Sequence, residues 1–172
     1  NKRDLIEYVS GDFLRGENFS LALKDIDVVY HLISTSLPKE SNNDPALDVE
    51  SNVIPTIRFL DHALKAGVKK IIFFSSGGTV YGEPHILPIP ETHITRPLCA
   101  YGAHKITIEI YLDLYFRLYR LDYRIIRIAN PFGKYQDPLS SQGVIPVFMQ
   151  KILKGQEIDI WGDGKIIRDY IH

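Results

Sequence analysis

Short runs of apolar, strand-forming residues alternate with long amphipathic stretches, and this alternation constrains the fold of the chain most. The runs cover residues 28–33, 71–74 and 123–128. Residues 28–33 in particular suit a strand that is buried on both faces of a sheet. The stretches between the runs are long enough to form helices that connect parallel strands. The alternation therefore predicts an α/β fold with a parallel sheet and crossover helices.

Helical spacing of apolar residues predicts helices over residues 44–66, 100–119 and 144–153. Pro55 lies inside the first of these segments, although proline fits the first turn of a helix better than its interior. The start of that helix is therefore placed loosely. Residues 158–161 suit a further short strand.

The charge balance and the cysteine content exclude several classes of partner. Lys and Arg together number 20 and Asp and Glu 21, which gives a net charge of −1. This balance offers no electrostatic case for nucleic acid or an anionic membrane surface. No apolar run approaches the roughly 20 residues that a membrane span needs. The single cysteine, Cys99, excludes an internal disulfide and fits a reducing compartment. We expect a cytoplasmic protein without nucleic-acid or membrane partners.

A tyrosine and a lysine four residues apart lie near the start of the predicted 100–119 helix. Tyr101 and Lys105 share one helix face, so their side chains lie close enough to interact. A nearby ammonium favours the phenolate and lowers the tyrosine pKa towards a value useful in a general base. The same spacing also occurs between ordinary surface residues of a helix, so it is weak on its own.

A hydroxyl-rich segment follows the predicted 71–74 strand. It contains Ser75, Ser76 and Thr79. In open parallel sheets, ligands bind at the carboxyl ends of the strands, where these hydroxyls should lie. One of them could bond the same substrate oxygen that Tyr101 deprotonates. A turn chosen for the backbone freedom of its glycines explains the segment equally well.

Together these segments resemble the extended short-chain dehydrogenase/reductases of the NAD-dependent epimerase/dehydratase family, and in particular the UDP-glucose 4-epimerases. The resemblance covers nearly the whole chain. Its markers occur in order as Gly11-Asp12-Phe13, Asp27-Val28-Val29-Tyr30-His31, Asn52-Val53, Ser75-Ser76, Val80-Tyr81-Gly82, Pro97, Tyr101 with Lys105, Arg127 to Asn130-Pro131, Gly162-Asp163-Gly164 and Arg168-Asp169-Tyr170. The ordered set is far more specific than any single marker.

The resemblance implies roles for individual residues. Tyr101 would be the catalytic base, and Lys105 would hold the nicotinamide ribose and depress the tyrosine pKa. The catalytic hydroxyl would come from Ser76 or Thr79, because Gly77 stands where the family usually has serine or threonine. We favour Ser76, since the glycine pair lets the loop shift its register. No metal ion is implied.

The implied binding residues form two groups. The cofactor group comprises Asp12, Phe13, His31, Leu32, Ile33, Asn52, Ser75, Tyr101, Lys105 and Ala129. The substrate group comprises Ser76, Thr79, Asn130, Gly143 and Arg168. Ordinary structural roles compete with some of these assignments: Asp12 suits a turn, His31 a core histidine, Asn52 a helix start and Asn130 a strand end. We favour function for Asn52, Asn130 and Arg168 and leave His31 open.

The fold implied by the resemblance is a Rossmann-like doubly wound parallel sheet, incomplete at its N-terminal βαβ unit. Residues 1–135 would form part of an NAD-binding domain, and residues 136–172 would begin a small substrate-binding subdomain, the two interleaved in one compact unit. The chain contains no Gly-x-x-Gly-x-x-Gly turn to hold the NAD pyrophosphate. We therefore expect a central piece of a longer enzyme that is inactive on its own. The residue that would distinguish NAD from NADP is missing with that turn.

The activity implied is NAD-dependent 4-epimerisation of a nucleotide sugar, most simply a UDP-sugar, by transient hydride transfer. The expected partner is a second copy of the chain, joined through the helices near 44–66 and 100–119. A reductase or decarboxylase remains an alternative. A 4,6-dehydratase is disfavoured because Gly78 and Thr79 occupy the places where such enzymes carry an acidic pair.

Overall fold

The computed structural model describes residues 5–136, 143–160 and 162–172. Contacts between residues divide the chain into two compact units, Asn1–Arg127 and Ile128–His172. The sequence predicted a boundary between two parts after residue 135, with both parts interleaved in one compact unit. The assignment of a cofactor role to the first part and a substrate role to the second stays a prediction.

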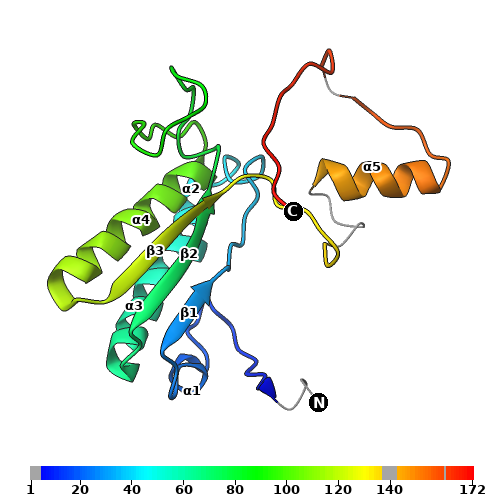
Figure 1. The fold of residues 1–172 in the computed structure, drawn as a ribbon. Coiled ribbons are helices and arrows are strands. Elements are labelled where there is room, and N and C mark those ends of the chain that lie inside the picture. The colour runs from blue at the N-terminus through cyan, green and yellow to red at the C-terminus, as the bar shows by residue number, and fades with distance from the viewer. Residues whose placement is uncertain (1–4, 137–142, 161) are drawn as a thin grey trace. The chain divides into compact units, whose positions relative to one another are not determined.

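The first unit is built on a three-stranded sheet. Strands β1 (Val28–His31), β2 (Lys70–Ser76) and β3 (Asp122–Ile128) lie in the order β1-β2-β3 (Figure 1). β1 and β2 are parallel, with Val29 opposite Ile71. The predicted α/β fold with a parallel sheet is confirmed, and it matches the expected Rossmann-like class.

Two helices cover one face of this sheet. α3 (Ile54–Ala66) and α4 (Ala100–Tyr119) pack against each other and against the strands (Figure 1). Alternate strand residues point towards them, and on β2 these are Ile71 and Phe73, which are fully buried. Burying an aliphatic or aromatic side chain of this size contributes about 1.5–3 kcal/mol. A short helix, α1 (Phe19–Ala22), packs against α3 and extends the core.

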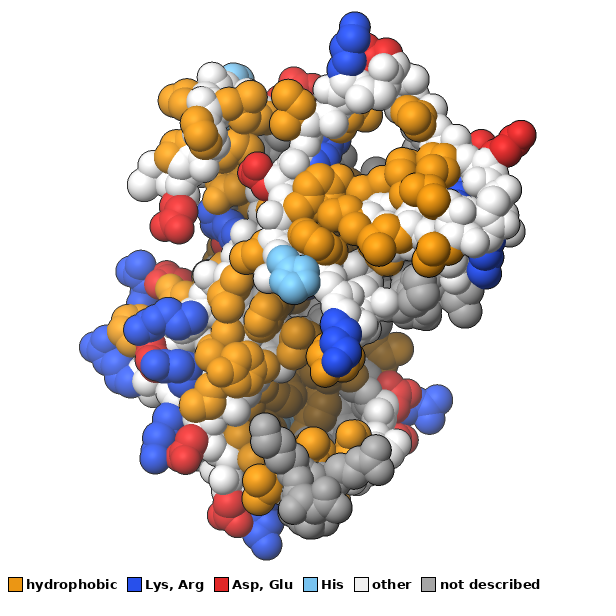
Figure 2. Space-filling model, turned by 45° about the vertical axis from the view of Figure 1, so that its right-hand side comes forward, with side chains coloured by type: hydrophobic (Ala, Val, Ile, Leu, Met, Phe, Trp, Pro, Cys, Tyr) orange, Lys and Arg blue, Asp and Glu red, His pale blue; other side chains and the backbone are white. Residues whose placement is uncertain are grey.

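The opposite face of the sheet carries exposed apolar side chains, so the prediction that residues 28–33 are buried on both faces is wrong. Val28, Tyr30 and Ile126 are all exposed, Tyr30 by 61%. The reason is that α3 and α4 both pack on the other face. Hydrophobic side chains gather in patches on the surface drawn in Figure 2. The strand also ends at His31, two residues earlier than predicted.

The helix predicted over residues 44–66 is present but changes its hydrogen bonding along its length. α2 (Pro45–Asp48) is followed by a π-helical turn, Val49–Val53, and then by α3. Asp44 caps the start by accepting a hydrogen bond from the Leu47 amide at 2.9 Å. Pro55 lies just beyond the π turn and has no N–H to give to the helical ladder. The wider turn accommodates that missing bond, which explains why proline is tolerated inside this run.

The start of α4 is fixed by side chains from a distant segment. The Ala100 amide donates to Asn42 Oδ1 at 2.8 Å, and the Tyr101 amide donates to Ser41 Oγ at 2.9 Å. These bonds satisfy amides that a helix leaves without internal partners. The bounds of α4 are those predicted from the sequence, and its position depends on the 41–42 segment.

The second unit contains the predicted helix α5 (Val144–Leu153) and an isolated parallel bridge between Pro131 and Ile171. The strand predicted at 158–161 is wrong for residues 158–160, which form no strand, and residue 161 lies outside the described residues. An extended segment becomes a strand only when its backbone pairs with a neighbour, and these three residues pair with none of the residues that the structure describes. In neither unit is any described helix both long and apolar enough to cross a bilayer.

A close backbone approach joins the first turn of α4 to the loop after β2. Gly102 is buried in that turn. A Cβ added to it would lie 2.5 Å from the Thr79 carbonyl oxygen and 2.7 Å from Pro97 Cβ. Only glycine allows α4 to approach the loop this closely.

We predict that Gly102→Ala lowers the free energy of unfolding by about 1–3 kcal/mol, because α4 must move away from the loop. Gly78→Ala is the matched control, since a Cβ at Gly78 meets nothing within 4 Å. Urea denaturation of both variants measures the difference. Helix propensity alone favours alanine over glycine by about 1 kcal/mol, so a Gly102→Ala variant more stable than wild type would contradict the prediction.

Candidate active site

The carboxyl end of β2 and the first turns of α4 meet in the first unit. Lys105 of α4 donates from Nζ to the Phe74 carbonyl oxygen of β2 at 3.0 Å. One turn earlier, Gly102 lies against the Thr79 backbone. The structure thus places the helix that carries Tyr101 and Lys105 directly against the hydroxyl-rich segment.

Lys105 is buried in aromatic surroundings. Its Nζ lies 4.9 Å from the centroid of the Phe73 ring and 5.5 Å from that of the Tyr101 ring. Burial lowers the pKa of Lys105 to about 8, while the negative charge of Asp48 acts in the opposite direction. Lys105 is therefore still mainly an ammonium at neutral pH, and its charge is held at a fixed place.

The pKa of Tyr101 moves in the direction opposite to the one the resemblance implied. It is raised, first because burial disfavours the phenolate, and then because of the charges of Cys99 and Asp48. The Lys105 ammonium bonds the Phe74 carbonyl and lies over the tyrosine ring. The expected depression of the Tyr101 pKa by Lys105 is thus not found in this structure.

The hydroxyls after β2 have different partners. Ser75 is buried and donates to Glu109 Oε1 at 2.5 Å. Ser76 Oγ accepts a hydrogen bond from the Thr79 amide at 3.2 Å, which leaves its own hydrogen free to donate. Thr79 Oγ1 is buried and has no partner among the residues described. Both candidates for the catalytic hydroxyl therefore keep a hydrogen to donate.

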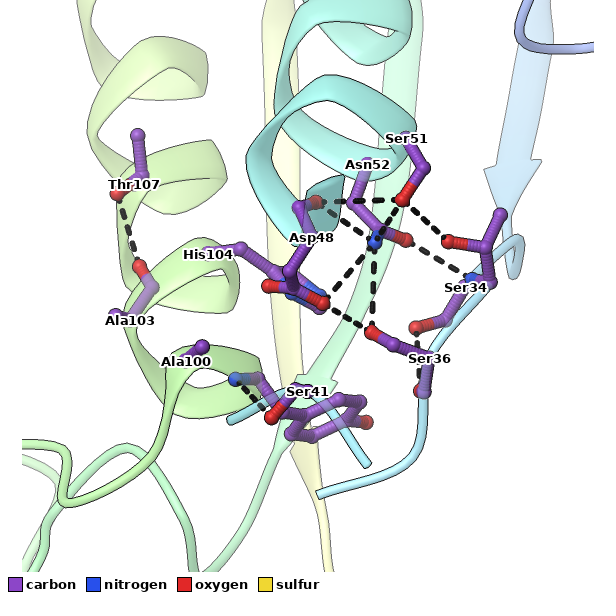
Figure 3. A network of polar contacts seen from close by, with 12 residues as sticks. Ser34, Ser36, Ser41, Asp48, Ser51, Asn52, Ala100, Ala103, His104 and Thr107 are labelled. Carbon is purple, nitrogen blue, oxygen red and sulfur yellow. Dashed lines mark hydrogen bonds and ion pairs between the residues drawn. The ribbon is translucent and has the colours of Figure 1, made fainter. Parts of the chain in front are cut away.

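Asn52 fastens the loop after β1 to the helical run above it (Figure 3). Its Oδ1 accepts from the Thr35 amide at 2.9 Å, and its Nδ2 donates to the Asp48 carbonyl at 3.0 Å. Further contacts join Nδ2 to Ser36 and Ser51. Asn52 is buried, and its amide is engaged within the chain. Its role towards a cofactor stays a prediction.

A carboxylate and an imidazole that sequence reasoning missed form a buried pair beside Tyr101. His104 Nδ1 lies 2.6 Å from Asp48 Oδ2, and each side chain is 1% exposed (Figure 3). Ser36 donates to the other oxygen of Asp48. The His104 and Tyr101 rings meet edge to face with centroids 5.0 Å apart. Two features of the sequence could have pointed to this pair. His104 lies between Tyr101 and Lys105, and Asp48 lies one helical turn before Asn52.

A second polar network lies at the ends of β2 and β3 and was also missed. Arg127 forms a two-point ion pair with Glu109, with Nη2–Oε2 2.6 Å and Nε–Oε1 3.1 Å. Arg127 also donates to the Tyr81 hydroxyl at 3.0 Å. The Glu109 bond raises the pKa of Arg127, so its guanidinium stays charged. Because Glu109 accepts from Ser75 as well, this network ties the loop after β2 to α4 and β3.

The N-terminal candidates lie at the core and in a turn. Asp12 accepts from the Leu14 amide at 2.8 Å, which is the arrangement of a turn-forming aspartate. The Phe13 ring packs 5.4 Å from the ring of His31. His31 is buried, and its Nε2 lies 3.1 Å from Thr56 Oγ1. Burial, reinforced by the charge of Lys105, lowers the pKa of His31 to about 4, so it is neutral at physiological pH.

The remaining candidates are placed as follows. Leu32 and Ile33 are exposed in the loop after β1. Ala129 is half-buried directly after β3. Gly143 precedes α5 with a positive φ of 90°, which favours glycine. These positions stay predicted contacts, because the structure holds no ligand that would test them.

Besides Gly143, two predicted substrate residues lie in the second unit. Asn130, with a φ of 29°, donates from Nδ2 to the Asp169 carbonyl at 2.8 Å. Arg168 is exposed and donates from Nη1 to the Ile167 carbonyl at 2.8 Å. The Asn130 bond thus draws the 168–172 tail to the segment after β3, and the Arg168 guanidinium keeps further donors for an anion.

The residues in place fit one part of a dinucleotide. The Lys105 ammonium carries three N–H donors and gives one to Phe74. Thr79 Oγ1, in the loop after β2, is a further buried polar atom without a partner among the described residues. A buried ammonium with donors to spare suits a ribose diol. The pyrophosphate would need donors that the Gly-rich turn normally supplies, and this sequence has no such turn.

The sequence matches the profile of the NAD dependent epimerase/dehydratase family over residues 1–172. It is 37% identical over 169 residues to the UDP-glucose 4-epimerase of Mycolicibacterium smegmatis. The aligned region covers 98% of this chain and 54% of that protein. The structure is similar to that of the UDP-glucose 4-epimerase of Thermotoga maritima with UDP-glucose. Their TM-score is 0.88 at 36% identity, over 95% of this chain and 54% of that one.

The chain spans about half the length of the relatives it matches. A dTDP-glucose 4,6-dehydratase of Streptomyces venezuelae, solved with NAD bound, aligns with a TM-score of 0.83 at 30% identity, over 96% of this chain and 50% of that one. The relatives thus include dehydratases, and a reductase of a dTDP-sugar as well, so likeness alone does not fix the reaction. The profile match over the whole sequence does fix the family: the chain belongs to the NAD-dependent epimerase/dehydratase family.

Proposed function

We propose that the whole protein containing this chain interconverts the C4 epimers of a UDP-sugar, with Tyr101 as the acid–base group. The observation that carries the proposal is the placement of Tyr101 and Lys105 on one face of α4, against the hydroxyl-rich end of β2. Relatives named as UDP-glucose 4-epimerases, at 36–37% identity, support the choice of reaction.

Each residue has a separate task in this proposal. Tyr101 takes the proton from the sugar 4-hydroxyl and later returns it. Ser76 or Thr79 donates a hydrogen bond to the same oxygen. Lys105 holds the ribose of the cofactor and fixes a positive charge beside Tyr101. NAD, when bound, supplies reversible hydride exchange at sugar carbon 4. The raised pKa of Tyr101 makes its phenolate scarce at neutral pH, so the proposed proton transfer requires a further positive charge near the ring when the site is complete.

Other reactions of the family are alternatives for the same site. Dehydration needs an additional acid and base to expel water. Gly78 and Thr79 stand where those groups would be needed, and neither residue can take that role. A reductase or decarboxylase would use the same Tyr101 and Lys105, and the product distinguishes it. For the 172-residue chain alone, we expect a folded but inactive protein, because the sequence has no Gly-rich turn.

We predict that Tyr101→Phe lowers kcat of the whole protein by about 10²–10⁴-fold, since it removes the proton acceptor and keeps the ring. Tyr111→Phe, on the same helix and packed against the core, is the matched control and should turn over at the wild-type rate. Steady-state interconversion of UDP-glucose and UDP-galactose measures both. Near-normal turnover by Tyr101→Phe would sink the proposed role.

Two further variants decide which hydroxyl assists Tyr101. We propose Ser76, because the bond it accepts from the Thr79 amide orients its hydrogen towards another partner. Ser76→Ala should lower kcat about 10²-fold, the loss typical of one such donor, whereas Thr79→Val should stay within a few-fold of wild type. The reverse pattern of rates would assign the hydroxyl to Thr79.

We also propose that the whole protein is a homodimer joined through α4 and the helical run at residues 45–66. Ile110, Leu114 and Leu118 are exposed on one stripe of α4, at spacings of four residues. A continuous apolar stripe on a helix is typical of a surface that another helix covers.

We predict a dimer by light scattering at micromolar concentration. Leu114→Glu should yield monomers, because it places a charge within the apolar stripe. Leu21→Glu on α1 is the control, since Leu21 is an exposed leucine away from α4. A monomeric wild-type protein, or dimers of Leu114→Glu, would rule out this interface.

A further inference from the structure

An ion pair between α4 and β3 holds the loop after β2 at both of its ends. Glu109 and Arg127 bond through two points, with Nη2–Oε2 2.6 Å and Nε–Oε1 3.1 Å. At the start of the loop, the Ser75 hydroxyl donates to Glu109 Oε1 at 2.5 Å. At its end, the Tyr81 hydroxyl accepts from Arg127 Nη1 at 3.0 Å. The proposed reaction uses none of these residues as a reacting group.

The ion pair is shielded from water, and its geometry is fixed. The Glu109 side chain is 8% exposed and that of Arg127 25% exposed. A guanidinium presents its N–H donors in a rigid plane, so a two-point bond to a carboxylate sets its orientation as well as its distance. The remaining nitrogen, Nη1, then meets the hydroxyl of Tyr81, whose ring centroid lies 5.0 Å from Arg127 Cζ. Both ends of the loop are therefore attached to rigidly held groups.

A shielded ion pair of this kind is better explained by the geometry that it imposes than by the stability that it adds. Removing two charges from water costs as much free energy as their attraction typically returns. The loop after β2 needs a constraint, because its adjacent glycines, Gly77 and Gly78, give the backbone wide freedom. The bond from the Thr79 amide to Ser76 Oγ lies within the loop and sets only its internal shape. The bonds at both ends of the loop therefore constrain where it lies against α4.

We propose that the Glu109–Arg127 ion pair positions the Ser76 hydroxyl for the reaction, by holding both ends of the loop that carries it. The proposal rests on the proposed roles of Ser76 and Tyr101. Ser76 directly follows Ser75, so a Ser75 released from Glu109 takes Ser76 with it. A displaced hydroxyl forms a longer and weaker bond to the oxygen that Tyr101 deprotonates, and the rate falls. Glu109 and Arg127 are positioning residues, because they act only through the loop.

Tyr81→Phe releases one end of the loop with the smallest change of structure. It removes the hydroxyl that Arg127 bonds and keeps the ring that faces the guanidinium. In the whole protein with NAD and UDP-glucose, we expect kcat to fall about tenfold, which is part of the roughly 10²-fold that a 1 Å misplacement can cost. KM should stay unchanged, because the hydroxyl that is displaced acts mainly in the transition state.

Tyr123→Phe is the matched control, because it removes a tyrosine hydroxyl that joins the same two elements away from the loop. The Tyr123 hydroxyl, on β3, donates to Asp113 of α4 at 3.2 Å. Thermal unfolding should show similar changes of Tm in Tyr81→Phe and Tyr123→Phe, whereas only Tyr81→Phe should lose kcat. A loss of kcat in Tyr123→Phe equal to that in Tyr81→Phe would overturn the proposal.

The double variant with Ser76→Ala tests whether the effect passes through Ser76. If the ion pair acts by positioning this hydroxyl, Tyr81→Phe should cost no further rate once the hydroxyl is gone. The kcat of Ser76→Ala/Tyr81→Phe should therefore equal that of Ser76→Ala. An equal loss from Tyr81→Phe in both backgrounds would contradict the proposal. Failure of the proposed function is seen separately, as normal turnover by Tyr101→Phe.

The order of the loop can also be measured without turnover, by hydrogen exchange of the Thr79 amide, which donates to Ser76 Oγ. We expect this amide to exchange faster in Tyr81→Phe than in wild type, because the loop opens more often when one end is released. In Tyr123→Phe its exchange should match that of wild type. Thr79 exchange that is unchanged in Tyr81→Phe would show that the loop does not depend on the ion pair and would overturn the proposal.

Discussion

Burial of the Lys105 ammonium is the constraint on which the candidate site depends. An ammonium removed from water must find compensating partners, and Lys105 finds the Phe74 carbonyl, the face of the Phe73 ring and the charge of Asp48. Each of these partners comes from an element other than α4. The sheet, the helical run at residues 45–66 and α4 must therefore meet at one place before the lysine can be accommodated. Tyr101, one turn away, is positioned by the same requirement.

The segments around Tyr101 are connected by polar contacts rather than by apolar packing alone. Ser41 and Asn42 fix the start of α4, and Asn52 ties the loop after β1 to the helical run. Gly102 then lets α4 approach the loop that carries the candidate hydroxyls. A displacement at any of these contacts would change the position of Tyr101 relative to Ser76 and Thr79. In the proposed reaction, small displacements of this kind cost rate, because proton transfer depends on hydrogen-bond distances.

Local patterns in the sequence predicted most of the elements, and contacts between distant residues explain the failures. Residues 100–119 and 144–153 have clear helical spacing, and both helices have the predicted bounds. The prediction that residues 28–33 are buried on both faces failed because a strand is buried on its second face only if another element packs there. The residues of the strand itself do not show whether one does. The Asp48–His104 pair joins residues 56 positions apart, so no local pattern contains it. The direction in which the Tyr101 pKa shifts likewise depends on burial and on the charge of Asp48. The spacing of Tyr101 and Lys105 in the sequence gives no information about either.

Product analysis by proton NMR is the direct test of the proposed 4-epimerase activity. The whole protein is incubated with NAD and, in turn, with each of a panel of UDP-sugars. We predict that the C4 epimer of one sugar appears without net reduction of the cofactor. A 4-keto-6-deoxy sugar, a decarboxylated product, or no epimer from any sugar would contradict the proposed epimerase while leaving the family intact.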